Sequence, residues 1–400
     1  MKPDITLIFP SSPFLLDQAV FPPLGILYLS AFLKQYGFKV QCLDMGVGHT
    51  LDMVKSNIVG VSFSTPQRDE AFKIANHFVG KKWLIAGGPH PTHMADECYE
   101  AGFQKVVKGY GEIGLLKVLN LLLSKGLEIP EIKSIDSFPF PDRNALPVLD
   151  YHYSIDGMPA TPIMTTRGCY EKCAFCARIE KGCEIQSAER TIDEINHLHE
   201  TYGFEAFMIF DDIFIASKKR LKKIADALEG KFKFRCFGRA NLITDEVCKD
   251  MVRLGVVEVG IGVESGSDEI LKLNMKGTSR RVNLNAFKML KEYGIRAKAF
   301  LIVGLPGETP HTIADTESWV MEAKPYDVDF SVFQPLPGSA IFEEPEMFGV
   351  SFDYDGIPGW YKGTPGQYKP MASTGALSPE KIVFYRELLE NKFKKSELLR

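Results

Sequence analysis

The 400-residue sequence lacks the features of a membrane protein, a secreted protein or a nucleic-acid-binding protein. No run approaches the ~18 consecutive apolar residues that a membrane-spanning helix requires. The first residues, Met1 to Asp4, lead into an expected strand and lack the apolar segment of a signal peptide. The net charge is −4, so no overall basic field favours nucleic acid. We therefore expect a cytoplasmic protein with no membrane or nucleic-acid partner.

Cysteine is sparse, with 8 residues in the chain, and three of them lie in one short run. Cys169, Cys173 and Cys176 form a C-x3-C-x2-C motif. The scattered remainder is typical of buried free thiols in a reducing compartment. These scattered cysteines are Cys42, Cys98, Cys183, Cys236 and Cys248.

The clustered cysteines predict an iron-sulfur site. Three thiolates on one loop can hold three irons of a 4Fe-4S cluster, which leaves the fourth iron open to bind and reduce another molecule. Zinc is one alternative, but it requires a fourth Cys or His, and Cys183 is the only nearby candidate. Buried core thiols are the other alternative. We favour the cluster, which also implies an anaerobic setting.

The first half of the chain alternates strand and helix patterns. Leu24, Leu27, Tyr28, Ala31 and Phe32 fall on one face of a helix, with Gly37 as its stop signal. Continuous apolar runs between such helices indicate a parallel sheet covered on both faces. Ligands of these sheets bind beyond the carboxyl ends of the strands. The expected strands are 5–9, 40–43, 58–62, 83–86 and 105–107.

The second half repeats the alternation and predicts a partial barrel of six βα units. Thr191 to Glu194 form an expected capping box for a helix that Gly203 ends. Thr309 and Pro310 are expected at the start of another helix. Residues 350–376 are rich in aromatic residues and could form a substrate lid, and 378–399 is an expected helix. The expected strands are 162–166, 206–210, 233–237, 257–262, 297–303 and 329–334.

Prolines concentrate between Ser137 and Leu149, which favours an extended linker there. We therefore divide the chain into an N-terminal domain, a linker, a barrel and a C-terminal capping segment. Their expected bounds are 1–136, 137–158, 159–340 and 341–400.

The cysteine run, with Phe175 in its aromatic position, resembles the signature loop of the radical S-adenosylmethionine (radical SAM) enzymes. The resemblance covers about 160–340. It implies that the open iron binds S-adenosylmethionine (SAM) and that one electron cleaves SAM to a 5′-deoxyadenosyl radical. It also implies that polar and glycine-rich stretches at later strand ends bind SAM. The resemblance does not distinguish Asp211 from Asp212 as the SAM-binding acid. The implied SAM-binding residues are Phe175, Asp211, Asp212, Arg239, Glu264, Ser265, Gly304 and Pro306.

The first half resembles the cobalamin-binding domain of class B radical SAM methyltransferases. Small residues at its strand ends would let a large flat ring approach the backbone. No Asp-x-His-x-x-Gly run is present, so a histidine of that motif does not ligate cobalt; His90 and His93 are weaker alternatives. Tyr110 replaces an acid that many relatives carry, and the absence of G-x-G-x-x-G after the first strand disfavours a dinucleotide. The implied cobalamin-binding residues are Leu24, Gly25, Ser62, Ser64, Thr65, Gln67, Gly87, Gly88, His90, Thr92, Gly109, Tyr110, Gly111 and Glu112.

Together the resemblances imply a Rossmann-like parallel-sheet cobalamin-binding domain, then a partial (β/α)6 radical SAM barrel and a small C-terminal helical segment. The implied activity is methylation of an unactivated carbon in a small molecule or a protein side chain. A glutamine of methyl-coenzyme M reductase is one candidate.

The implied electron donor is a low-potential protein such as ferredoxin or flavodoxin. A cyclase or rearrangement enzyme is the main alternative, and a cobalamin carrier without chemistry is another. A methylthiotransferase is disfavoured because the first half has only Cys42 and Cys98.

Overall fold

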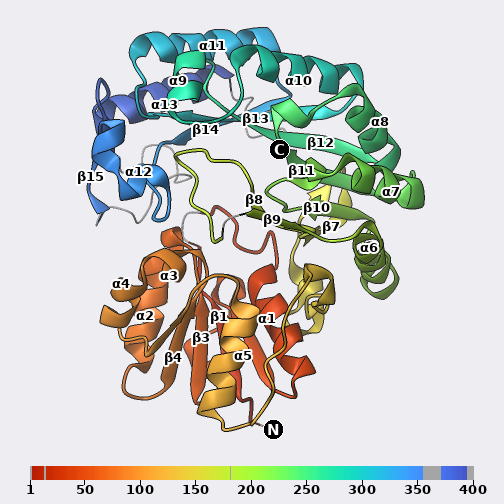
Figure 1. The fold of residues 1–400 in the computed structure, drawn as a ribbon, viewed down its shortest axis with the longest axis vertical. Helices are drawn as coiled ribbons and strands as arrows, with labels where there is room; N and C mark the ends of the chain where they lie inside the picture. The colour runs from red at the N-terminus through yellow and green to blue at the C-terminus, as the bar shows by residue number, and fades with distance from the viewer. Residues whose placement is uncertain (1, 13–14, 181, 355–370, 394–400) are drawn as a thin grey trace. The chain divides into compact units, whose positions relative to one another are not determined.

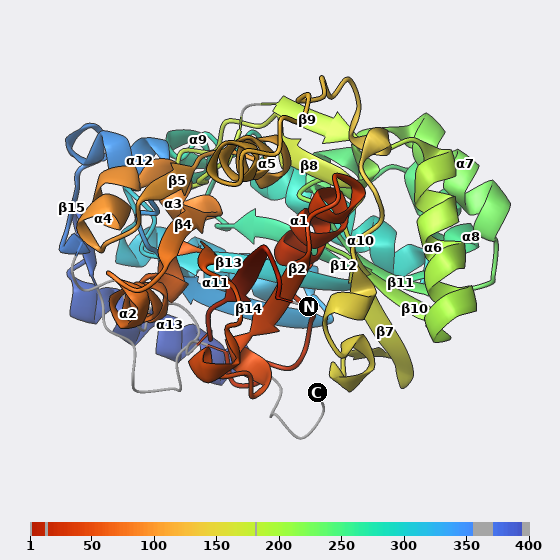
Figure 2. The same cartoon turned by 90° about the horizontal axis from the view of Figure 1, so that it is seen from below.

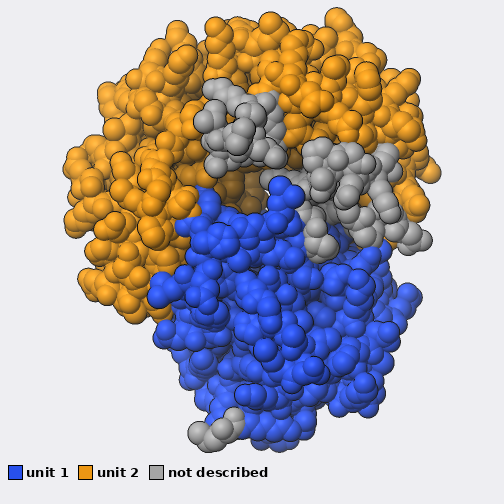
Figure 3. Space-filling model, turned by 180° about the vertical axis from the view of Figure 1, so that it is seen from behind, with its two compact units in different colours: residues 1–153, 178–184 blue, residues 154–177, 185–400 orange. Residues whose placement is uncertain are grey.

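The structure is a computed structural model that describes residues 2–12, 15–180, 182–354 and 371–393. The aromatic residues Trp360, Tyr361 and Tyr368 of the expected lid lie outside the described residues. The chain forms two compact units, shown in two colours in Figure 3. Unit 1 comprises Met1–Tyr153 and Arg178–Glu184, and unit 2 comprises Ser154–Ala177 and Ile185–Arg400.

Unit 1 is built on a parallel five-stranded sheet in the order β2-β1-β3-β4-β5. The pairing aligns Ile8 with Leu43 on one side and with Val61 on the other. Each strand expected in the first half is present, with ends that differ by at most one residue. The strands are β1 (Ile5–Phe9), β2 (Val40–Asp44), β3 (Ile58–Ser62), β4 (Trp83–Gly87) and β5 (Lys105–Val107).

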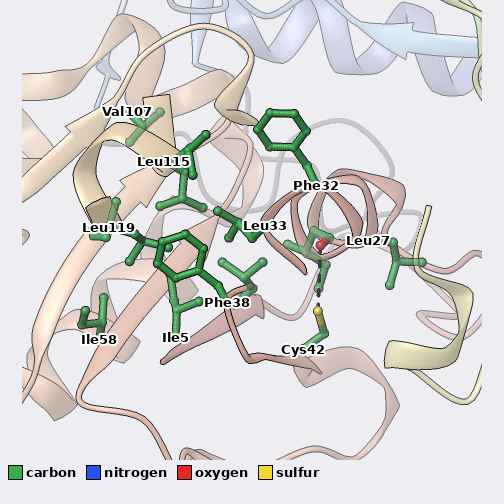
Figure 4. Packing of buried hydrophobic residues seen from close by; sticks show 14 of the residues in the cluster. Ile5, Leu27, Phe32, Leu33, Phe38, Cys42, Ile58, Val107, Leu115 and Leu119 are labelled. Atoms are coloured by element: carbon green, nitrogen blue, oxygen red, sulfur yellow. Dashed lines mark hydrogen bonds between the residues drawn. The ribbon is translucent and has the colours of Figure 1, made fainter. Parts of the chain in front are cut away.

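Helices cover both faces of this sheet (Figure 2). One apolar core joins Ile5 and Leu7 to α1 and α5, and Figure 4 shows this packing, with Cys42 Sγ directed at the carbonyl of Ile26. A second core joins Ile8 and Val61 to α2 and α4. The helices are α1 (Leu24–Gln35), α2 (Arg68–Phe78), α3 (Pro89–His93), α4 (Ala95–Glu100) and α5 (Gly111–Leu122).

The proline-rich segment that we expected to be a linker packs into unit 1 up to residue 153. Ile135, Phe138 and Leu146 belong to the core beneath α1 and α5. The Tyr151 hydroxyl donates to Asp44 Oδ2 at 2.7 Å and ties the segment to the end of β2. The segment contains three short 3-10 turns, η4 (Ile135–Ser137), η5 (Arg143–Ala145) and η6 (Val148–Asp150).

Unit 2 contains a curled half-barrel whose strand order is β14-β13-β12-β11-β10-β7-β6. Its strands from β7 to β14 are parallel, and short β6 pairs antiparallel with β7. Helices line the outside of the curved sheet in Figure 1. The expected partial (β/α)6 barrel is confirmed. The strands are β6 (Ser154–Ile155), β7 (Met158–Ile163), β10 (Ala206–Ile209), β11 (Lys233–Gly238), β12 (Val256–Glu264), β13 (Arg296–Val303) and β14 (Asp327–Val332).

Helix caps in unit 2 agree with the sequence at two positions and correct it at a third. Gly203 ends α6 at φ 76°, and Thr309 caps α11. The expected capping box at Thr191 is wrong, because α6 begins after Ser187, whose hydroxyl accepts from Arg190 N. The helices are α6 (Ala188–Tyr202), α7 (Lys218–Leu228), α8 (Asp245–Leu254), α9 (Asp268–Leu273), α10 (Arg280–Glu292), α11 (Pro310–Ala323), α12 (Ala340–Glu343) and α13 (Pro379–Phe393).

Short strands complete the described chain: β8 (Thr166–Cys169), β9 (Gly182–Ile185), and the antiparallel pair β15 (Val350–Phe352) and β16 (Ala372–Thr374). Within the described residues, no helix has both the length and the apolar character needed to cross a bilayer.

Candidate active site

The cysteine loop leaves the end of β8 and is fixed by backbone hydrogen bonds. Ala174 N donates to Asn274 O at 3.0 Å, and Ala174 O accepts from Ile341 N at 3.2 Å. Within the loop, Cys176 N donates to Cys173 O at 3.2 Å. The loop between α9 and α10 therefore serves as the platform on which the central part of the cysteine loop rests.

Cys173 lies beside two cationic side chains that favour its thiolate form. It is buried, and Arg239 Nη1 lies 3.8 Å from its Sγ. The thiol of Cys176, which donates to Cys173, and the Lys276 and Arg239 cations lower the pKa of Cys173 to about 6, against the opposing effect of burial. Because the thiolate is the form that binds metal, this environment suits an iron ligand.

Three cysteine thiols are the donor set that a 4Fe-4S cluster with one open iron requires. Among the described residues, no group of three or more His, Cys, Asp or Glu side chains is arranged to hold one metal ion. In a 4Fe-4S cluster each thiolate binds its own iron, so Cys169, Cys173 and Cys176 need not converge on one point.

A buried ion pair stands beside the cysteine loop. Lys276 Nζ donates to Glu264 Oε1 at 2.6 Å, and both side chains are about nine-tenths buried. Glu264 ends β12 at φ 65°, a conformation that non-glycine residues rarely adopt. A Cβ at Gly262 would lie 2.3 Å from the Glu264 carboxylate, so this position must be glycine for the pair to form. Sequence reasoning found Glu264 but missed Lys276, whose only local signal is the turn residue Gly277.

Arg239 connects these parts at the carboxyl end of β11. Its Nη2 donates to Lys276 O at 2.7 Å, and its Nε lies 3.3 Å from Glu171 Oε1. Phe175 is half-buried, and Lys276 Nζ stands 5.9 Å from its ring centroid. The structure therefore brings together Cys173, Phe175, Arg239 and Glu264, as the sequence predicted.

The structure distinguishes the two aspartates that follow β10. Asp211 is buried, and its carboxylate accepts from Thr165 N, Thr165 Oγ1 and Thr166 N at 2.5, 2.5 and 3.0 Å. Burial raises its pKa, which the Thr165 hydrogen bonds oppose. Asp211 therefore holds the Thr165–Thr166 backbone in place, and its role in binding SAM stays a prediction. Asp212 is exposed.

Two further predicted SAM-binding residues are also engaged inside unit 2. Ser265 is fully buried; its hydroxyl accepts from Ser267 N and lies 3.3 Å from Thr316 Oγ1. Pro306 is buried, and its carbonyl accepts from Asn274 Nδ2 at 3.0 Å. Both residues shape the rim of the barrel from within, and neither side chain is directed at solvent. Sequence reasoning missed Asn274, which holds the cysteine loop and the Pro306 turn together.

Position 304 requires glycine because of close packing within unit 2. Gly304 adopts φ 93°, and a Cβ there would lie 2.7 Å from the Ile382 side chain of α13. Its N–H donates to Glu308 Oε2 at 2.5 Å. Desolvation raises the pKa of the fully buried Glu308 to about 8, and the N–H groups of Gly304 and Leu305 limit the rise. Glu308 was not recognised from sequence.

Gln334 is a candidate ligand-binding residue in unit 2. It follows β14 at the carboxyl edge of the barrel and is 8% exposed. Neither its Nε2 nor its Oε1 has a hydrogen-bond partner among the described residues. An unsatisfied buried amide is costly, so a polar group supplied by a bound molecule would relieve the cost.

At the carboxyl edge of the unit 1 sheet, Gln67 ties loops together. Its Nε2 donates to Pro10 O at 2.9 Å and to Ser12 Oγ at 3.0 Å. Its Oε1 accepts from Ser64 N at 3.1 Å and from Ser64 Oγ at 2.9 Å. Gln67 is 2% exposed and positions the loop, and its contact with cobalamin stays a prediction.

His90 is also directed into unit 1. It is fully buried, its Nδ1 lies 3.2 Å from Thr65 Oγ1, and its Nε2 lies 3.2 Å from Glu97 Oε2. Its ring packs 5.4 Å from that of Phe63. With both ring nitrogens facing protein groups, His90 supports the loop of Thr65, and its contact with cobalamin stays a prediction.

Contacts join the loops that follow β4 and β5. Thr92 Oγ1 donates to Gly88 O at 2.8 Å and accepts from Gly109 N at 3.1 Å. Tyr110 N donates to Glu180 Oε1 at 3.2 Å, and a Cβ at Gly109 would lie 2.4 Å from the same oxygen. Glu180 was not singled out in the sequence, although it lies four residues beyond Cys176. Glu112 is buried in the first turn of α5, and a Cβ at Gly111 would lie 3.0 Å from Leu29.

The rest of the predicted cobalamin-binding residues remain accessible at this edge. Gly25 is exposed, with no atom within 4 Å of where a Cβ would stand. Glycine and small hydroxyl residues predominate at these strand ends, which suits the approach of a large ring to the backbone. The partly or fully exposed members are Leu24, Gly25, Ser62, Ser64, Gly87, Gly88, Thr92, Gly109, Tyr110 and Gly111.

Two family models match the chain in chain order. The B12 binding domain matches residues 18–119, and the radical SAM superfamily matches residues 163–320. The matched regions lie in unit 1 and mostly in unit 2, respectively. A B12 binding domain specifies cobalamin, and a radical SAM domain specifies a 4Fe-4S cluster and SAM. These are therefore the cofactors of this chain.

Relatives that match most of the chain include a protein named as a methyltransferase and one named as a cyclase. An uncharacterized methyltransferase of Pyrococcus horikoshii is 29% identical over 80% of this chain and 78% of its own length. The anaerobic magnesium-protoporphyrin IX monomethyl ester cyclase of Cereibacter sphaeroides is 26% identical over 83% of this chain and 62% of its own length.

Among solved structures, the radical SAM methyltransferase TsrM from Kitasatospora setae, with cobalamin and a 4Fe-4S cluster bound, shares the fold. Its TM-score is 0.69 at 17% identity, over 88% of this chain and 77% of that one. The two domain matches and the relative named as a methyltransferase support the cobalamin-dependent radical SAM methyltransferase family for this chain.

Proposed function

We propose that this protein methylates an unactivated carbon and that Cys169, Cys173 and Cys176 hold its 4Fe-4S cluster. The observation that carries the proposal is the environment of Cys173. Two cations, Arg239 and Lys276, stand beside a buried thiol of lowered pKa on a loop anchored at both sides. When bound, the cluster supplies the electron that cleaves SAM, and cobalamin supplies the methyl group to the substrate carbon.

Conservation of atoms and electrons determines the products of the proposed reaction. Each methylation consumes two SAM molecules and two electrons. The hydrogen removed from the substrate leaves in 5′-deoxyadenosine, and the other products are methionine, S-adenosylhomocysteine and the methylated substrate. A low-potential donor such as ferredoxin or flavodoxin would supply the electrons.

The chain's own residues would bind and orient SAM. Asp212 and the Glu264–Lys276 pair offer groups of both charges near the cysteine loop. Gln334 would give its unsatisfied amide to a polar group of SAM. In unit 1, Gln67 and Thr92 would hold the loops that receive cobalamin, and Gly25, with no atom within 4 Å of where a Cβ would stand, would leave room for the ring.

A cyclase or rearrangement reaction is the second candidate, because the Cereibacter sphaeroides relative is named as a cyclase. SAM carrying a trideuterated methyl group separates the two. The reconstituted, anaerobic protein would be incubated with candidate substrates: a glutamine peptide of methyl-coenzyme M reductase and a porphyrin monomethyl ester. Methylation predicts a product that retains three deuterium atoms. A converted substrate without deuterium would instead establish the cyclase reading.

A further inference from the structure

Three phenylalanine rings form a continuous surface on the concave face of the barrel. Phe210 directly follows β10, Phe237 lies in β11 and Phe300 lies in β13. The ring centroids of Phe210 and Phe237 are 6.4 Å apart with planes at 22°, and those of Phe237 and Phe300 are 5.8 Å apart at 56°. We call this surface, made of Phe210, Phe237 and Phe300, the aromatic shelf.

The shelf exists because β12, which lies between β11 and β13, carries a glycine there. A Cβ at Gly260 would lie 2.6 Å from Phe300 Cε2 and 3.0 Å from Phe237 Cδ1. Any side chain at Gly260 would therefore displace both rings. The missing side chain lets the rings of Phe237 and Phe300 meet across an intervening strand.

The shelf rings differ from the barrel's core rings in exposure. Along β11 and β13, buried and half-buried residues alternate, so the two faces of the sheet are distinguished. Phe237 and Phe300 are half-buried and Phe210 is 36% exposed, whereas Phe207 and Phe234 are fully buried. Aromatic side chains left partly exposed on a concave face are typical of ligand sites.

Charged groups beneath the shelf are paired with one another. Lys298 Nζ lies 5.4 Å from the Phe300 centroid and 2.8 Å from Asp327 Oδ2. Arg235 and Arg296 both contact Glu258 on the neighbouring strand. Because these cations already have carboxylate partners, the floor of this face does not select for a charged ligand. The flat aromatic rings are therefore the feature that would recognise a ligand on this face.

We propose that the aromatic shelf binds a planar, conjugated ring system of the substrate. The inference rests on the proposed function and narrows its substrate class. Phe210 and Phe237 each lie two residues before a rim residue, Asp212 and Arg239, so the shelf lies directly below the proposed SAM-binding rim. A ring stacked there would present its edge substituents toward the rim.

Two uncharged bicyclic probes of similar size test this assignment: indole, which is planar and conjugated, and octahydrobenzofuran, which is saturated and puckered. Binding to the reconstituted full chain would be measured by ligand-observed NMR. Each aromatic contact is worth about two- to tenfold in affinity, so wild type should prefer indole by at least about threefold. The double variant Phe237→Leu/Phe300→Leu should lose that preference. Phe207→Leu, the same change on the helix-facing side of β10, should keep it.

Three outcomes would overturn the assignment. One is equal binding of the two probes to wild type. Another is an indole preference that survives in both the double variant and Phe210→Leu, a change at a position that is 36% exposed and outside the apolar core. The third is a parallel loss of SAM cleavage and indole preference in the shelf variants, which would assign the rings to the adenine of SAM. Failure of the proposed function is separate, because wild type would then form no S-adenosylhomocysteine and no methylated product whichever probe it bound.

Discussion

Lys276 donates to Glu264 at 2.6 Å in the space that Gly262 leaves free. The pair joins the end of β12 to the segment between α9 and α10, which also holds the cysteine loop through Asn274 O. The stability of the barrel rim and the position of the proposed cluster loop are therefore linked through one buried contact.

Lys276→Met should destabilise unit 2 strongly, because it leaves the Glu264 carboxylate buried without its cation. Breaking such a pair costs about 3–5 kcal/mol, and the double variant Lys276→Met/Glu264→Gln should recover much of that loss. Urea unfolding followed by near-UV circular dichroism would measure both. Lys249→Met is the matched control, since Lys249 and Asp245 form an equally short but exposed pair. A loss in the control as large as that in Lys276→Met would contradict the account.

Gln67→Ala should weaken cobalamin binding by at least about tenfold, because roughly 1 kcal/mol is lost with each hydrogen bond that holds the loops. Titration of the protein with hydroxocobalamin would measure the change. Gln41→Ala is the control: Gln41 accepts from Thr6 Oγ1 and donates to Met53 O, but lies near the opposite end of the sheet. Equal losses of affinity in both variants would show that general destabilisation, not loop position, is responsible.

Glu308 should make stability fall as the pH rises. Its carboxyl ionises near 4.5 in the unfolded chain and near 8 in the buried site, so between these values the folded state holds a proton that the unfolded state has released. The free energy of unfolding should therefore decrease with pH in this window, by at most about 1.4 kcal/mol per unit. Thermal melts from pH 5 to 8.5 would show a slope for wild type that Glu308→Gln lacks. Identical slopes would contradict the buried, protonated state.

Gln334→Leu should stabilise the protein and weaken SAM binding. The change removes two buried polar atoms that lack partners among the described residues, a cost of about 1–3 kcal/mol. The melting temperature without SAM should therefore rise, while the affinity for SAM, measured by equilibrium dialysis, should fall. A lower melting temperature would mean that the amide already has a partner, and unchanged affinity would remove Gln334 from the proposed site.

Most strands of both units could be predicted from sequence, because buried parallel strands are short apolar runs between helices. The first barrel strand was misplaced: it was expected at 162–166, whereas β7 spans Met158–Ile163. Helix starts were less predictable: Thr191 looks like a cap, but Ser187 competes for the role one turn earlier. The family resemblance located Glu264 and Arg239. It could not find Lys276, whose partner lies 12 positions away, or separate Asp211 from Asp212, because burial on one side of a strand end is a tertiary property.

The same limit applies to the glycines. Gly88, Gly109 and Gly304 were predicted to admit a cofactor, yet their missing Cβ atoms first make room for Phe63, Glu180 and Ile382. A glycine in a sequence reports that something approaches closely, and only the structure tells whether that is a ligand or the chain itself.

The central claim is that this chain uses SAM both as radical source and as methyl donor. The most direct measurement is quantification of 5′-deoxyadenosine and S-adenosylhomocysteine after anaerobic reconstitution with iron, sulfide, cobalamin and a strong reductant. We predict both products for wild type and for Cys183→Ser, and no 5′-deoxyadenosine for Cys169→Ser, Cys173→Ser or Cys176→Ser. Wild type that forms 5′-deoxyadenosine without S-adenosylhomocysteine, or cysteine variants that retain cleavage, would contradict the account.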